Sequence, residues 1–99
     1  MPYAIEYTEA AERHLQALTA RQRAIVLDAV EEQLAHQPTV ETRNRKRMRA
    51  NPLAGWELRV GELRVYFDVE EGPDAVVTVR GIGIKERDQV WLAGERSDF

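Results

Sequence analysis

The chain has 99 residues, of which 43% are hydrophobic and 31% charged, and its formal net charge is −3. This length fits a single domain over residues 1–99, and the composition is that of a globular protein with one core. No apolar stretch is long enough to span a membrane, and the N-terminus lacks the blocks of a signal peptide, so we expect a cytoplasmic protein. The absence of cysteine excludes disulfides, thiolate catalysis and cysteine-ligated zinc.

The charge is unevenly distributed along the chain. Residues 41–64 contain half of all the basic residues, namely six arginines and Lys46, while the segments on either side are net acidic. Charges more than roughly 8–10 Å apart are screened at physiological salt, so a local basic segment can bind phosphate even in a chain with a pI near 5.4. The chain as a whole gives nucleic acid no long-range attraction.

The first forty residues predict a strand followed by a helical hairpin. Residues 3–7 alternate in polarity, which is typical of a short strand. Thr8 and Thr19 are suited to cap two successive helices, the second of which is expected to end near His36 because Pro38 follows. The apolar stripe predicted for this second helix comprises Leu27, Val30 and Leu34, flanked by Val26.

The second half of the chain predicts an antiparallel meander. After a polar loop over residues 39–48, apolar and polar residues alternate with a period of two. Tight turns separate three predicted strands, which cover residues 56–60, 63–69 and 75–84. Residues 85–92 are predicted to form a short helix or an irregular arm, and residues 96–99 to fray. These elements predict an α+β fold, in which the N-terminal strand and two-helix hairpin pack on one face of the meander.

The same alternation predicts which side chains lie on the face that the helices leave open. Each of the three strands contributes one arginine, Arg59, Arg64 and Arg80, and this face also carries Glu57 and Tyr66. Three converging guanidinium groups repel one another unless something neutralises them. Two interpretations follow: an anion-binding site, or a solvated face on which the arginines pair with neighbouring carboxylates.

Other polar residues are weaker candidates. The basic loop with Arg45, Lys46, Arg47 and Arg49 is interpreted either as a solvated connector or as a phosphate contact. The two histidines are isolated from each other and from further ligands, so we expect no metal and no cofactor.

In three segments the chain resembles the RelE/ParE superfamily, the toxins of bacterial type II toxin–antitoxin systems: YAIEYTEAAERHLQAL, LAHQPTVETRNRKRMRANPLAGWELRVGELRVYFDV and VVTVRGIGIKERDQVW. The run over residues 56–69 is similar to the family's W-x-(L/I)-R … Y-R-(V/I)-x-Y-x-V meander, and residues 83–87 to its V-G-(H)-K/R-x-R strand exit. The resemblance covers nearly the whole chain. It implies a small toxin that a cognate antitoxin neutralises, as a homodimer or a toxin–antitoxin hetero-oligomer.

Fold alone does not choose between the activities of this superfamily. RelE-like members cleave mRNA in the ribosomal A site, whereas ParE-like members inhibit DNA gyrase. We predict a RelE-like, ribosome-associated and metal-independent mRNA endoribonuclease that inhibits translation. The alternative is a ParE-like gyrase inhibitor or a non-catalytic protein-interaction module with the toxin fold.

The resemblance implies roles for individual residues. Arg64 matches the central-strand arginine of RelE-like toxins, and Lys85 matches their basic residue at the strand exit. Arg59 lies where a meander lysine is usual and keeps its charge, whereas Glu57 reverses the charge of another, and we assign Glu57 to proton transfer. Trp91 stands where a tyrosine is common, and base stacking is assigned to Trp91 or Tyr66. The predicted catalytic residues are Glu57, Arg59, Arg64 and Lys85, and the predicted substrate-binding residues are Arg80, Tyr66, Trp91, Arg87, Arg45, Lys46, Arg47 and Arg49.

Overall fold

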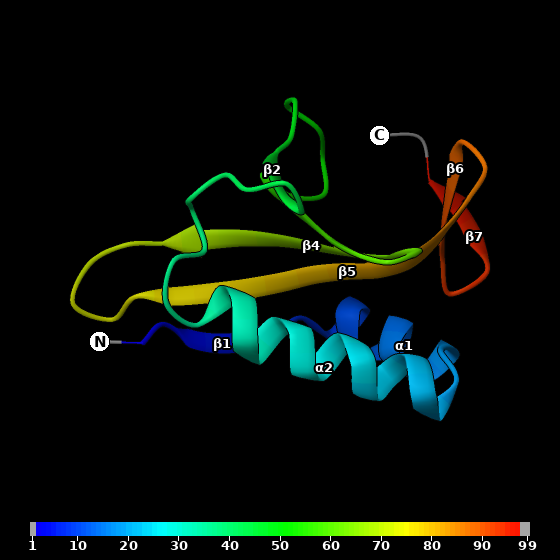
Figure 1. Cartoon of the computed structure of the whole chain (residues 1–99), viewed down its shortest axis with the longest axis horizontal. Coiled ribbons are helices and arrows are strands. Elements are labelled where there is room, and N and C mark those ends of the chain that lie inside the picture. Colours follow the sequence, from blue (N-terminus) through cyan, green and yellow to red (C-terminus); the bar gives the residue numbers. More distant parts are fainter. Residues whose placement is uncertain (1, 98–99) are drawn as a thin grey trace.

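A computed structural model describes residues 2–97 as two helices packed on one face of a seven-stranded sheet (Figure 1). The elements follow in the order β1 (Ala4–Tyr7), α1 (Glu9–Ala17), α2 (Ala20–Leu34), β2 (Arg45–Arg47), β3 (Trp56–Val60), β4 (Leu63–Glu70), β5 (Val76–Glu86), β6 (Gln89–Leu92) and β7 (Glu95–Ser97). The strands are ordered β2-β3-β4-β5-β6-β7, and β1 pairs in parallel with β5. The predicted α+β fold, with its N-terminal strand, helical hairpin and meander, is confirmed.

Both helices begin where the sequence predicts, because threonine side chains cap them. The Thr8 hydroxyl accepts a hydrogen bond from the Ala11 N–H at 3.1 Å, and Thr19 forms a capping box with Gln22. Helix α2 ends at Leu34, two residues before the predicted His36.

The buried stripe of α2 differs from the prediction at one position. Val26, Val30 and Leu34 are fully buried, but Leu27 is 37% exposed. Ala29 occupies the buried position instead, because the centre of the stripe lies along Val26 and Val30 and leaves Leu27 at its margin.

The predicted inward face of the meander is confirmed. Leu63, Val65 and Phe67 of β4 are buried under the helices, and Phe67 stacks on Trp56 of β3 with ring centroids 6.1 Å apart. The pairing of β4 with β5 shifts once, since Phe67 faces Val79 while Tyr66 faces Gly81. Arg80 is therefore an extra residue in a β-bulge, which bends β5 at this point.

Two parts of the chain contradict the predictions. Residues 85–92 form neither a helix nor an irregular arm: β5 continues to Glu86 and leads into the antiparallel strands β6 and β7. The turns are tight because Arg87, Ala93 and Gly94 adopt positive φ angles of 58°, 51° and 83°. Within the predicted polar loop, residues 45–47 form the edge strand β2. Of the segment predicted to fray, residues 98–99 lie outside the described part of the chain.

No helix among residues 2–97 is long and apolar enough to cross a membrane.

Candidate nucleic-acid interface

The candidate site lies on the face of the sheet that the helices leave open. There Arg59 lies directly opposite Arg64, and Glu57 lies opposite Tyr66. The connection between β2 and β3 extends to the same side of the sheet (Figure 1). The register thus brings the predicted residues of β3 and β4 onto one surface.

Carboxylates already neutralise two of the three arginines. The Arg59 Nε donates to the Glu57 Oε1 at 3.0 Å, and the Arg80 Nε donates to the Asp68 Oδ2 at 2.6 Å. In both pairs the side chains remain partly exposed, so the guanidinium groups are accessible from solvent. Of the two interpretations of this face, local pairing of arginines with carboxylates is the one that the structure shows.

Arg64, by contrast, is occupied by its own backbone surroundings. Only 8% of this residue is exposed, and its Nη1 donates to the carbonyl oxygens of Gly61 at 2.7 Å and Leu63 at 2.8 Å. The side chain therefore stabilises the turn between β3 and β4 through these two hydrogen bonds. The expectation that Arg64 lies uncovered beside Arg59 and Arg80 is wrong.

Tyr66 is fully buried, which contradicts its prediction as an exposed substrate contact. Leu53, from the connection between β2 and β3, lies over Gly81, the β5 partner of Tyr66, and so covers this part of the face. Burial raises the pKa of the Tyr66 phenol, and the charge of Glu57 and a hydrogen bond with it raise this pKa further. The phenol therefore stays protonated near neutral pH.

Asn51 organises the loop over residues 48–55. Its amide nitrogen donates to the carbonyl oxygens of Arg49 and Ala54, and its Oδ1 accepts from the N–H groups of Leu53 and Ala54. The Gly55 N–H donates to the Asp68 Oδ1 at 2.7 Å, which ties the loop to β4. The sequence did not predict the role of Asn51 or the contact of Asp68 with this loop; Asn51-Pro52 is a turn signal that would have indicated the first.

Two hollows flank this loop. One, of about 580 Å³, has four basic residues and one carboxylate in its lining, and we call it the basic groove. Those residues are Lys46, Arg47, Arg49, Arg59 and Glu57. The other, of about 510 Å³, lies between the loop and the Arg80–Asp68 pair. The groove thus brings basic residues of β2, β3 and the loop next to Glu57.

Arg45 is not part of the groove. This residue is only 7% exposed, and its guanidinium donates to the carbonyl oxygens of Val40 at 2.7 Å and Gln33 at 2.5 Å. Burial lowers its pKa. Arg45 therefore fastens the segment after α2 to the sheet, and its prediction as a substrate contact is corrected.

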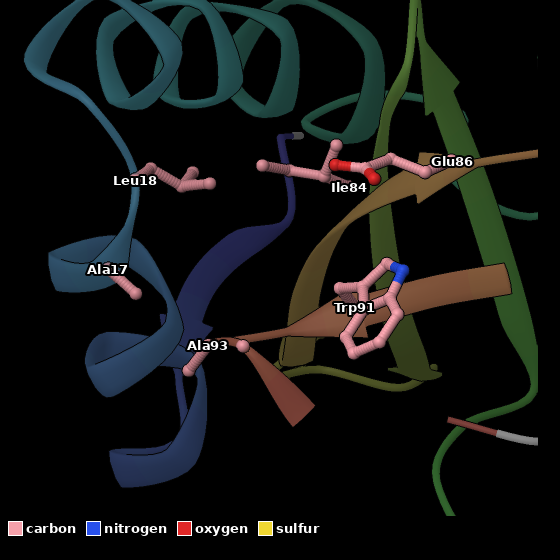
Figure 2. A pocket seen from close by; sticks show the side chains of 7 residues that line it. Ala17, Leu18, Ile84, Glu86, Trp91 and Ala93 are labelled. Atoms are coloured by element: carbon pink, nitrogen blue, oxygen red, sulfur yellow. The ribbon is translucent and has the colours of Figure 1, made fainter. Parts of the chain in front are cut away.

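The remaining predicted residues lie away from Glu57. Lys85 is four residues beyond Gly81 along β5, or about 13 Å at ~3.3 Å per residue, and Arg87 follows in the turn to β6. Trp91 pairs with Ile84 and lines a pocket with residues of α1 on the helix side of the sheet (Figure 2). The predicted catalytic set is therefore not gathered in one place, and Trp91 lies on the opposite face from Glu57.

Among the described residues, no group of three histidine or acidic side chains is arranged to hold a metal ion.

Comparisons with known proteins bear on the fold. No protein-family model matches the chain, and no curated protein matches it either. A solved structure does: a chain of the toxin–antitoxin complex RelBE2 from Mycobacterium tuberculosis superimposes with a TM-score of 0.73. The match covers 86% of this chain and 100% of that one, at 22% sequence identity. The chain has the fold of the RelE-like toxins. This RelE-like fold is the one that the sequence motifs predict.

Proposed function

We propose that the chain is the toxin of a type II toxin–antitoxin system, which binds mRNA in the basic groove and is neutralised by a cognate antitoxin. The basic groove carries the proposal: on a RelE-like fold, its lining combines four basic residues with one partly buried carboxylate. Because the net charge of the chain is −3, the attraction for RNA comes from the groove and not from the chain as a whole. We propose that the toxin acts in the cytoplasm on ribosome-bound mRNA.

RNA phosphates would bind to the cations of the groove. Lys46 and Arg49 are exposed and take part in none of the ion pairs among the described residues. Arg47 pairs with Trp56 and has its guanidinium carbon 5.7 Å from the centre of the Trp56 ring, so this side chain lies on the Trp56 side of β2 and lines the groove from its edge. Such contacts release counterions, so binding should weaken steeply with salt.

Cleavage would use Glu57 as the general base. In this step the Glu57 carboxylate takes the proton of the ribose 2′-hydroxyl, the 2′-oxygen forms a bond to phosphorus, and the bond from phosphorus to the 5′-oxygen breaks. The products are a 2′,3′-cyclic phosphate and a 5′-hydroxyl, to which Glu57 returns the proton. Arg59, whose Nε holds the Glu57 carboxylate, and Lys46, which lies opposite Glu57, would stabilise the charge that develops on the phosphate.

A non-cleaving toxin is the second candidate, and two observations favour it. Arg64 donates to backbone carbonyls, and Lys85 lies about 13 Å along β5 from the Glu57 row. Neither residue is therefore placed to stabilise a phosphate bound next to Glu57. In this case the same face would bind DNA gyrase, as in ParE-like toxins, or another protein.

The test is to add the purified chain to translating ribosomes and map the mRNA ends. The proposal expects cuts within the A-site codon, and Glu57→Gln should slow cutting by about 10²- to 10⁴-fold because the general base is lost. The matched control is Glu70→Gln, which removes an exposed carboxylate at the far end of β4 and should leave mRNA cleavage unchanged. Arrested growth with intact mRNA and broken DNA would replace the ribonuclease with the gyrase inhibitor.

A further inference from the structure

A third hollow lies on the helix side of the sheet, between the end of α1 and the last three strands (Figure 2). Its volume is about 390 Å³. We call it the tryptophan pocket, and it is lined by Ala17, Leu18, Ile84, Glu86, Trp91, Ala93 and Gly94. The mechanism proposed above uses none of these residues.

The pocket combines apolar walls, an aromatic ring and one carboxylate. Trp91 is 37% exposed, and Figure 2 shows its ring and the Glu86 carboxylate on the same side of the pocket, across from Ala17 and Leu18. Glu86 takes part in none of the three ion pairs found among the described residues. An exposed indole face beside such a carboxylate attracts a cation, while Leu18 and Ile84 offer apolar surface to an aliphatic stem.

The turn between β6 and β7 forms one wall of the pocket. Ala93 and Gly94 form the turn between β6 and β7 and both have positive φ, which is the geometry of a tight two-residue hairpin. A preformed pocket costs little ordering on binding, so even a single side chain can bind specifically.

We propose that the tryptophan pocket binds an arginine side chain of the antitoxin, with the guanidinium between the Trp91 ring and the Glu86 carboxylate. Arginine fits better than lysine, because its planar group can stack on an indole and bind a carboxylate through two hydrogen bonds. RNA is the less suitable ligand, because the Glu86 carboxylate repels phosphate, although Arg96 lies opposite Trp91 across β6 and β7. The identity of the partner rests on the proposed function, whereas the chemistry of the pocket does not.

The experiment is an NMR titration of the full chain with N-acetyl-arginine methylamide. Its uncharged isostere N-acetyl-citrulline methylamide, N-acetyl-leucine methylamide and adenosine monophosphate are titrated in parallel. The arginine probe should shift the Trp91 indole signal and the amides of Ala17 and Ala93, and it should bind about tenfold more tightly than citrulline, since one charge-assisted contact is lost. Glu86→Gln should abolish that preference, whereas Glu70→Gln, at the other end of the sheet, should keep it.

Three outcomes would overturn the proposal: equal binding of leucine and arginine, tighter binding of the nucleotide at Trp91, or no saturable shift with any probe. Trp91→Leu keeps the pocket apolar and removes the ring, so unchanged arginine binding in this variant would also contradict it. The readout does not depend on toxicity. Failure of the pocket and failure of the toxin role are therefore distinguishable.

Discussion

The two faces of the sheet carry hollows of opposite chemistry. The basic groove lies on the open face and presents Lys46 and Arg49 to an anion, whereas the tryptophan pocket lies on the helix side and presents Glu86 and an indole ring. Strand alternation places Lys46 with Glu57 on the open face and Trp91 with Ile84 on the helix side. The net charge of the chain therefore does not predict its ligands, because one hollow is lined mainly by positive charges and the other by a negative charge.

The largest expected effect is the loss of RNA binding when the cations of the basic groove are removed. Replacing Lys46, Arg47 and Arg49 together by alanine should weaken binding of single-stranded RNA about 100-fold, and should reduce the slope of log affinity against log salt by about 2. Trp91→Leu should leave both quantities unchanged. Fluorescence anisotropy over a range of salt concentrations measures both quantities. An equal loss of RNA affinity in both variants would show that RNA does not bind specifically in the basic groove.

A second contrast lies within β2, where neighbouring basic residues point in opposite directions. Arg45→Ala should lower the free energy of unfolding by about 2–3 kcal/mol, because the carbonyl groups of Val40 and Gln33 lose a charged donor. Lys46→Ala should change it by less than about 0.5 kcal/mol, since that side chain is exposed. Urea denaturation of both variants is the measurement, and similar stabilities would contradict the burial of Arg45.

A substitution at Gly83 should disturb the hairpin of β6 and β7, and with it the tryptophan pocket, without changing the basic groove. A Cβ at this position would lie 2.6 Å from the Leu92 Cδ2 and 2.7 Å from the Trp91 carbonyl oxygen, so β6 must move. Gly83→Ala should destabilise the fold by about 1–3 kcal/mol and weaken arginine binding, while RNA affinity stays unchanged. Gly81→Ala is the control for thermal unfolding and should cost less, because its new Cβ meets the flexible Leu53 side chain at 3.3 Å.

The smallest expected effect concerns pH and the contact between α1 and β5. The His14 Nδ1 accepts the Ile82 N–H at 3.1 Å, beside the bulge in β5. Burial and the nearby Arg13 lower the pKa of His14 below its usual 6.5, and Glu95 opposes this shift. The unfolded chain therefore binds a proton more readily, so stability is complete above pH 6.5 and falls as the pH drops towards the lowered pKa.

His14→Gln removes this titration and keeps an acceptor for the Ile82 N–H. Melting temperatures between pH 5 and pH 8, a range chosen around the usual histidine pKa of about 6.5, should fall less on acidification in this variant than in the natural chain. Parallel curves would show that His14 does not link protonation to folding.

The sequence predicted β1, both helices, the three-stranded meander and its inward face, but it missed β2, β6 and β7 and predicted the site only in part. Thr8 and Thr19 identified both helix starts, and the alternation in β4 identified its buried residues, because capping and periodicity are local properties. Alternation also placed Arg59 and Arg64 on one face, but it could not show that Arg64 turns back onto the carbonyls of Gly61 and Leu63.

What the sequence by itself determined is the RelE-like α+β fold and the concentration of positive charge between residues 41 and 64. Only the tertiary structure decided which of those charges are available. Leu53 covers the Tyr66 row, carbonyl groups from distant segments hold Arg45, and Trp91 lies across the sheet from Glu57. Each outcome depends on how separate elements and loops pack against one another, which the polarity pattern within a single element does not encode.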